Sequence, residues 1–206
     1  MKKTGLILTG LIIAILTHAQ TIKIQGGPSF SKLNWGSPSL YDKTLTGYSV
    51  FAGIDYLNSK YFNLSSNIGM IRKGGKSEIN ISVPLLPATI IEKPTLDYIS
   101  INTTIDLKYP IKKMSPFISC GPRFDHLIKS SSQFGGLKAL NVLENKSIGL
   151  LLGGGVKFDF SKIQLGLRAD YYLNFTKIAE RTDSFGNSQK VTVNTYTIDL
   201  MIGYRI

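Results

Sequence analysis

Apart from His18 near the N-terminus, the chain has one histidine, and its neighbours make it the first candidate for chemistry. His126 follows Asp125, and Ser130, Ser131 and Ser132 come shortly after it. A histidine, an acid and a serine form a hydrolytic triad only where the fold brings the nucleophile into hydrogen-bonding contact with its base. This spacing does not require such contact, so we expect His126 in a loop or near a strand end. The sequence predicts no catalytic residue.

Motifs for metals, cofactors and phosphate groups are weaker still. Cys120, His126 and scattered aspartates show no recognised metal-ligand spacing. The triplet 153–155 consists of glycines, but no Lys-Ser/Thr follows it and no helical pattern begins there. We therefore expect these glycines inside a strand, as bulge or close-packing positions. No metal and no cofactor is predicted, and the single cysteine excludes an intramolecular disulfide.

The remaining chemical feature is a set of charged residues that alternate with apolar ones. They are Asp55, Asp106, Lys108, Lys157, Asp159, Arg168, Asp170, Asp199 and Arg205. Gathered on one face, they could line a polar channel or pair with one another and fill it. Unpaired charge in a narrow lumen is costly, and both signs occur in similar numbers, so the sequence favours a plug of paired charges.

The C-terminal segment, 191–206, shows most clearly which elements position these charges. Every second residue from position 196 onward is apolar, and the residues between are mostly polar or small: Tyr196, Ile198, Leu200, Ile202, Tyr204 and Ile206 against Thr195, Thr197, Asp199, Met201, Gly203 and Arg205. A period of two places the two sets on opposite faces of a strand. An apolar face that runs to the last residue must be closed by a partner or covered by lipid.

The same period recurs along the chain and predicts eight strands, at 21–33, 45–57, 61–73, 99–109, 117–129, 147–160, 163–178 and 191–206. The segment 117–129 is the least clear, because its two faces are mixed. Connections after the second, fourth and sixth strands are short, and the others are long. This rhythm is typical of outer-membrane barrels with short periplasmic turns and long external loops. We predict an all-β fold, an eight-stranded antiparallel up-and-down transmembrane β-barrel.

The N-terminus reads as a secretory signal peptide at 1–19, followed by one barrel domain at 20–206. Lys2 and Lys3 form a positive region, 6–16 is an apolar core too short to span a membrane, and a small-residue cleavage site precedes Gln20. The net charge of the 206 residues is +11, and removal of the two lysines leaves 22 basic against 13 acidic residues. The basic residues are scattered and form no compact patch, so no nucleic-acid partner is expected.

Glycines and aromatics indicate which face points outward. Glycines are frequent on the polar face, where they would leave room for long charged side chains inside a narrow barrel. Aromatic residues at strand ends fit the girdles at the two membrane interfaces: Tyr48, Tyr56, Tyr109, Phe160, Phe175 and Tyr204. A lipid-facing apolar surface is therefore favoured over a soluble, lipocalin-like barrel.

The ordered set of short motifs resembles the PorT-type outer-membrane β-barrel family, small barrels related in shape to the OmpA transmembrane domain. The motifs are Gly26-Gly27-Pro28-Ser29-Phe30-Ser31, Lys73-Gly74, Tyr98-Ile99-Ser100-Ile101, Lys108-Tyr109, Ser115-Pro116-Phe117, Gly121-Pro122, Gly149 to Val156, Arg168 with Tyr171 and Tyr172, and Gly203-Tyr204-Arg205. Ser66-Asn67 stands where such proteins often carry Pro-Glu, and Ile206 where a terminal Phe is usual. The resemblance implies a barrel fold, and some members look linked to protein secretion.

Three functions follow as hypotheses. The favoured one is an integral outer-membrane barrel of a Gram-negative bacterium with a structural or interaction role, whose loops at 74–94 and 130–146 are the binding surfaces. Its expected partners are outer-membrane lipid and lipopolysaccharide, the barrel-assembly machinery during insertion, and a protein bound by the loops. The alternatives are a lipid-active outer-membrane enzyme that uses His126, and a secreted soluble barrel that binds a small apolar ligand.

Overall fold

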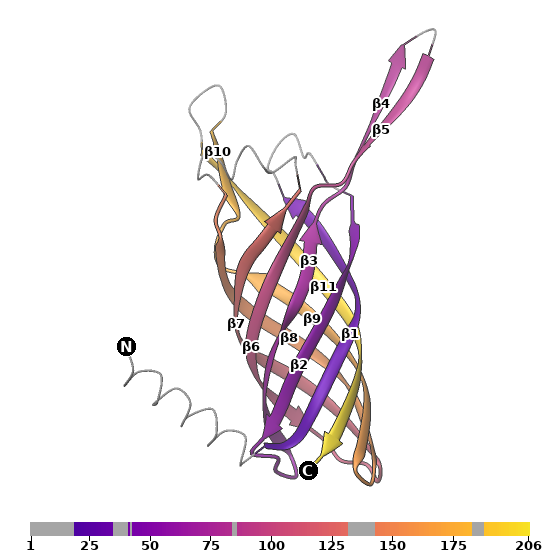
Figure 1. Ribbon diagram of the computed structural model, residues 1–206, viewed down its shortest axis with the longest axis vertical. Helices are drawn as coiled ribbons and strands as arrows, with labels where there is room; N and C mark the ends of the chain where they lie inside the picture. Colours follow the sequence, from indigo (N-terminus) through magenta and orange to yellow (C-terminus); the bar gives the residue numbers. More distant parts are fainter. Residues whose placement is uncertain (1–18, 35–40, 42, 84–85, 132–142, 183–187) are drawn as a thin grey trace.

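In the computed structural model of the chain, eight strands with alternating apolar and polar residues form one closed sheet (Figure 1). The structure describes residues 19–34, 41, 43–83, 86–131, 143–182 and 188–206. The strands of the ring are, in spatial and chain order, β1 (Ala19–Asn34), β2 (Leu45–Tyr56), β3 (Phe62–Gly74), β6 (Thr95–Lys108), β7 (Met114–Ser130), β8 (Lys146–Phe160), β9 (Ile163–Asn174) and β11 (Ser188–Arg205). Neighbours pair antiparallel, and β1 also pairs with β11, from Thr21 opposite Arg205 to Asn34 opposite Thr192. The predicted up-and-down barrel is confirmed.

The apolar face of these strands points outward. Ile24 and Leu200 on the outer wall are 63% and 68% exposed, whereas Asp106 and Asp199 in the interior are fully buried. Such a surface needs lipid around it, because a soluble protein rarely exposes an apolar area of this extent. A soluble barrel that binds an apolar ligand has the opposite arrangement, with its apolar face inside.

The two ends of the barrel differ in the length of their connections. The turns at 57–61, 109–113 and 161–162 lie at one end, together with the start of β1 and the end of β11 (Figure 1). The longer connections lie at the other end. This arrangement confirms the predicted alternation of short turns and long loops. Outer-membrane barrels have their short turns on the periplasmic side, so the short-turn end is named the periplasmic end and the opposite one the extracellular end.

Two segments predicted as loops contain further strands. Residues 74–94 form a hairpin of β4 (Ser77–Val83) and β5 (Leu86–Glu92), which projects beyond the long-loop end of the barrel (Figure 1). Prolines at positions 84, 87 and 94 hid its alternation. The segment 179–190 contains β10 (Ala179–Thr182), which pairs with the beginning of β11 from Ala179 opposite Val191. As a result β11 begins at Ser188, earlier than predicted, and β9 ends at Asn174.

The segment 117–129, whose apolar pattern is unclear in the sequence, belongs to a regular strand in the structure. β7 begins at Met114, and its residues are alternately buried and exposed as far as Ile128. Two apolar residues on its inner face, Phe117 and Leu127, had made the two faces look mixed. The strand tolerates Gly121-Pro122, but the β6–β7 ladder lacks the pairs that these two residues would make with Thr104 and Thr103. Proline has no amide hydrogen for such a pair.

The same interruption occurs where β1 meets β11. There the ladder passes from Gly26 opposite Leu200 directly to Ser29 opposite Thr197, which leaves out Gly27-Pro28. A Cβ at Gly27 would lie 1.9 Å from a backbone oxygen of the neighbouring strand, as would one at Gly121. The two weakened seams divide the eight strands into two halves of four.

Most of the predicted signal peptide lies outside the described residues. Its last residue, Ala19, opens β1 opposite Tyr56, so cleavage before Gln20 would leave the barrel strand almost whole. Within the described ranges, no helix has the length and apolar character that a membrane span requires.

Candidate functional site

A continuous chain of ion pairs fills the periplasmic half of the lumen. Lys23 Nζ lies 2.6 Å from Asp55 Oδ1, and Lys157 Nζ lies 3.2 Å from Asp55 Oδ2 and 3.0 Å from Asp106 Oδ2. Arg168 continues the chain, since its Nη1 lies 3.6 Å from Asp106 Oδ1 and its Nε 2.7 Å from Asp170 Oδ2. These side chains are at most 4% exposed and come from five strands. Three cations thus balance three carboxylates, the paired plug that the sequence favoured.

Glycines on the inner face create the space for this chain, as expected. A Cβ at Gly153 would lie 1.8 Å from Asp170 Oδ1, and one at Gly53 would lie 2.1 Å from Asn67 Oδ1. Neither glycine adopts a backbone conformation that other residues avoid. The lumen of an eight-stranded barrel is just wide enough for side chains, so small residues opposite long ones permit close packing.

A second ionic cluster lies toward the extracellular end. Asp125 on β7 accepts a 2.5 Å hydrogen bond from Lys73 Nζ and another from Arg123. The Lys73 ammonium lies 5.1 Å from the ring centres of both Tyr98 and Tyr172, and the Arg123 guanidinium lies 5.1 Å from the Tyr172 ring. Aromatic faces stabilise cations in such desolvated places. This cluster therefore closes the lumen with charge and with bulk.

Between the two ionic clusters, the lumen is lined by uncharged polar side chains and by the carboxylate of Asp199. Asn67 Nδ2 donates to Asn102 Oδ1 at 2.8 Å, and Asp199 accepts hydrogen bonds from Ser49 and, at 2.8 Å, from Thr197. The amide pair satisfies Asn67 Nδ2, whereas Asn67 Oδ1 is buried without a hydrogen-bond partner among the described residues.

An apolar cluster fills the extracellular mouth of the barrel. It comprises Leu33, Phe51, Ile71, Leu96, Tyr98, Leu127, Leu143, Leu151, Tyr172, Ile178, Ala179, Val191 and Val193. Leu33, Ile71 and Leu96 are fully buried. Leu143 and Ile178 come from the described ends of the connections between strands and pack into the mouth. The cluster excludes water where an open channel would need a polar path.

At the periplasmic end the lumen narrows to a small polar hollow. Its volume is about 20 Å³, and Asn63, Ser115 and Gln164 contribute to its lining. That volume accommodates about one water molecule. Arg205 and Asp159, which the sequence placed on the charged face, pair here at 2.7 Å, and Lys108 bonds to Asn58. The end opposite the loops is therefore narrow as well.

The projecting hairpin is tied to the loop end by charge. Glu78 accepts bonds from Lys43 and from Lys76 at 2.5 Å, and these two hydrogen bonds lower the pKa of Glu78 to about 2. Tyr41 donates a 2.7 Å hydrogen bond to Glu92, and burial followed by this bond raises the pKa of Tyr41 to about 12. Lys43 and Lys76 also exchange backbone hydrogen bonds of 3.0 Å. The base of the hairpin is therefore anchored to the 41–43 segment.

The structure separates the residues of the hydrolase hypothesis. Asp125 is fully buried in the lumen, whereas His126, the next residue on β7, is exposed on the outer wall. Ser131 Oγ accepts a 3.2 Å hydrogen bond from the amide of Thr95, and Ser132 lies outside the described residues. Asp125 cannot orient the imidazole of His126 from the opposite face of the strand, so this pair provides no acid–base couple.

The other sequence candidates occupy structural positions. Gly153, Gly154 and Gly155 lie within β8, opposite Ser119, Ile118 and Phe117 of β7, as expected for close-packing positions. Cys120 is exposed on the outer wall. Five of the six aromatics expected in the girdles are exposed, for example Tyr109 at 68%, Phe175 at 66% and Tyr204 at 52%, whereas Tyr56 is half-buried.

Sequence reasoning missed four charged residues of the lumen: Lys23, Lys73, Arg123 and Asp125. A signal for Lys23 was present, since it alternates with the outward Ile22 and Ile24. Arg123 and Asp125 share a face by their spacing of two, but the mixed pattern around them concealed which face this is. Lys73 on β3 and Asp125 on β7 belong to strands that are not adjacent in the sheet, and a period of two cannot indicate such a pair.

Comparison with known proteins places this geometry among outer-membrane barrels. The family model for the outer membrane protein beta-barrel domain matches residues 17–180. The crystal structure of Neisserial surface protein A is 12% identical with a TM-score of 0.53, and the similarity covers 90% of this chain and 97% of that chain. No curated protein matches the chain.

Other solved barrels are similar at a lower level. OprG from Pseudomonas aeruginosa is 10% identical with a TM-score of 0.49, over 92% of this chain and 98% of that chain. The outer membrane enzyme PagL is 12% identical with a TM-score of 0.40, over 89% of this chain and 99% of that chain. At such identities the likeness to Neisserial surface protein A supports the fold alone, and the two lower scores support no inference about activity.

Proposed function

The chain belongs to the outer membrane protein beta-barrel domain family, and from this premise we propose that it has a structural or interaction role in the outer membrane. In this role its extracellular hairpin and loops recognise a partner, and its lumen passes no solute. The observation that carries the proposal is the filled lumen. Two paired ionic clusters and an apolar cluster occupy the space that a channel would need.

The energetic argument against conduction follows from burial. A pore through the lower lumen would have to separate Lys157 from Asp55 and Asp106, three side chains at most 4% exposed. Removing buried charges from their partners costs several kcal/mol per ion. At the other end, the fully buried Leu33 and Leu96 would have to move apart to admit water.

The hairpin of β4 and β5 supports the interaction role. In the part of the chain that the structure describes, these strands form a sheet of two, so both are edge strands. A two-stranded ribbon is marginal alone. Here Glu78, Lys43 and Lys76 hold it to the barrel. An extended segment of a partner protein can add to such an edge through main-chain hydrogen bonds. The second predicted binding loop, 130–146, lies largely outside the described residues.

Further expectations belong to the same proposal. The motif resemblance supports membership of the PorT-type group within the barrel family, and the N-terminal pattern supports export by a signal peptide in a Gram-negative bacterium. Lys32, Lys129 and Lys146 are exposed near the extracellular strand ends, where they suit contact with lipopolysaccharide phosphates. Insertion would use the barrel-assembly machinery.

The lumen is tested by measuring current across a planar lipid bilayer that contains the purified barrel. We expect no stable conductance steps, with a known porin as the positive control. Reproducible steps that persist in different preparations would contradict the closed lumen.

The interaction role is tested by photo-crosslinking in whole cells. A photoreactive residue at Ile90, which is 45% exposed on β5, is expected to form a protein adduct. The matched position is Lys60 in a periplasmic turn, where the same adduct is not expected. Absence of an adduct at Ile90, or the same adduct at both positions, would refute recognition by the hairpin.

A further inference from the structure

The outer wall of the barrel carries an apolar hollow over the β6–β7 seam. Its volume is about 890 Å³. Thr103, Cys120 and Gly121 are the small residues over which it opens, and larger side chains such as Leu107 and Leu152 flank it. It lies where the ladder omits the pairs of Gly121-Pro122. Small side chains at an interrupted ladder leave a depression in an otherwise filled apolar surface.

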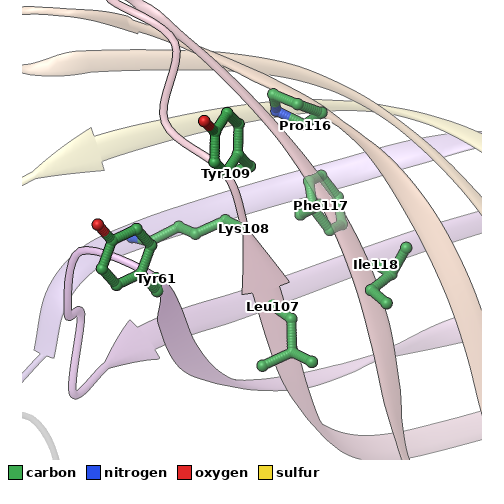
Figure 2. A pocket seen from close by; sticks show the side chains of 7 residues that line it. All are labelled: Tyr61, Leu107, Lys108, Tyr109, Pro116, Phe117 and Ile118. Atoms are coloured by element: carbon green, nitrogen blue, oxygen red, sulfur yellow. The ribbon is translucent and has the colours of Figure 1, made fainter.

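A second hollow continues the first toward the periplasmic end. It measures about 500 Å³, and the two share Leu107 and Ile118 in their linings. Figure 2 shows Tyr61 and Tyr109 beside it, with the Lys108 side chain extending between β6 and Tyr61. Tyr61 and Tyr109 are 56% and 68% exposed. Together the two hollows form one trough with an apolar inner part and an aromatic, basic end.

The length of the trough matches one leaflet of a bilayer. From Thr103 to Tyr109, six residue steps along β6 span about 20 Å at ~3.3 Å per residue. A strand tilt of ~45° reduces this to about 14 Å along the membrane normal, close to half of a hydrocarbon core of ~30 Å. The trough therefore runs from the periplasmic interface to the middle of the membrane.

The turns at this end carry one sign of charge. The three turns at 57–61, 109–113 and 161–162 contain Lys60, Lys112, Lys113 and Lys162 and no acidic residue. Lys60 lies 5.1 Å from the Tyr61 ring centre, at the mouth of the trough. Exposed lysines next to a membrane surface attract lipid phosphates. The polar end of the trough is thus complementary to an anionic headgroup.

From this geometry we propose that the trough is a binding site for one glycerophospholipid of the periplasmic leaflet. An acyl chain lies over Thr103, Cys120 and Gly121. The phosphate lies among Lys60, Lys112 and Lys113 of the two turns beside the trough, with Tyr61 and Tyr109 at the interface. Lipopolysaccharide occupies the opposite leaflet and does not reach this end. A second copy of the chain fits poorly, because a two-fold contact would place one concave face against another. The proposal requires that the outer wall lies in a membrane.

The site is tested by native mass spectrometry of barrels reconstituted with palmitoyl-oleoyl-phosphatidylglycerol and -phosphatidylethanolamine and then stripped with detergent. The wild type is expected to retain one phospholipid. Cys120→Phe fills the trough from an exposed position and is expected to reduce retention at least about tenfold. The matched control is Ala52→Phe, in a separate outer hollow of about 390 Å³, which is expected to retain lipid within about twofold of the wild type.

A test variant and a control examine the basic end of the trough, where the headgroup is proposed to bind. The double variant Lys112→Gln/Lys113→Gln, in the turn beside the trough, is expected to reduce retention about tenfold. Lys162→Gln, in the turn between β8 and β9, is the control and is expected to retain lipid as the wild type does. Each variant is first checked for a heat-dependent shift of mobility in SDS gels, which reports a closed barrel.

Three results would overturn the site. They are a wild type that retains no phospholipid, equal loss in Cys120→Phe and Ala52→Phe, and a Cys120-linked disulfide dimer in oxidised membranes, which would place a second copy in the trough. A barrel that shifts with heat but retains no lipid refutes the trough alone. A chain that fails to shift refutes the membrane barrel on which the trough depends.

Discussion

Lys157 is the residue whose removal tests the filled lumen most sharply. Its ammonium contacts Asp55 at 3.2 Å and Asp106 at 3.0 Å, and its side chain is 3% exposed. Replacement by Met conserves the length of the side chain and leaves one carboxylate in excess. Removal of one partner from a buried pair destabilises by about 3–5 kcal/mol. Asp55 retains Lys23 at 2.6 Å and Asp106 retains Arg168 at 3.6 Å, so we expect the lower end, about 3 kcal/mol.

The double variant Lys157→Met/Asp106→Asn restores neutrality. If the excess charge causes the loss, the double variant should be more stable than the sum of the single effects by about 1–3 kcal/mol. The assay is urea unfolding of the barrel in lipid vesicles, followed by the mobility shift in SDS gels. Lys113→Met in an exposed turn is the control and should change the unfolding free energy by less than about 0.5 kcal/mol. A Lys157→Met variant as stable as this control, or strictly additive effects, would refute a paired lumen.

The remaining predictions concern the glycines that leave space in the lumen, the apolar cluster at the extracellular mouth, and the hairpin. Gly153→Ala places a Cβ 1.8 Å from Asp170 Oδ1 and should lower the temperature at which the folded band is lost, whereas Gly154→Ala, with 3.1 Å to its nearest atom, should lower it less. Leu96→Ala should destabilise by about 2–4 kcal/mol in urea unfolding, because Leu96 is fully buried, and an unchanged midpoint would contradict a packed mouth. Glu78 has a depressed pKa of about 2, so its contribution to the hairpin is present above the unfolded value of 4.5 and is lost as pH falls through about 2. The protection factors of the hairpin amides, which correct for the intrinsic pH dependence of exchange, should therefore fall over that range in the wild type and remain flat in Glu78→Gln.

Much of the fold could be predicted from the sequence because its main rule is local. A period of two places Asp106, Lys157 and Arg168 on one face whatever the tertiary structure. The rule fails where the lumen face is apolar. Phe117 is buried there because Lys157 and Arg168 lie 5.0 and 5.8 Å from its ring centre, a contact that only the closed barrel creates. At the extracellular mouth, likewise, apolar side chains occupy the interior where polar residues are expected.

The partners within the site depend on closure and could not be predicted. Lys157 on β8 and Asp55 on β2 are 102 residues apart and face each other across the lumen. Asp125 was visible only beside His126, its neighbour in sequence, although its contacts are Lys73 and Arg123. The hairpin of β4 and β5 was hidden because prolines interrupt a pattern that cross-strand pairs such as Ile79 opposite Ile90 complete.

The central claim, a closed barrel with its apolar wall in lipid, is tested most directly by an SDS gel of the detergent-extracted membrane fraction with and without boiling. A closed barrel in lipid is expected to give a band that resists SDS in the unboiled sample and changes mobility after boiling. A protein found in the aqueous fraction, with one mobility in both samples, would contradict it.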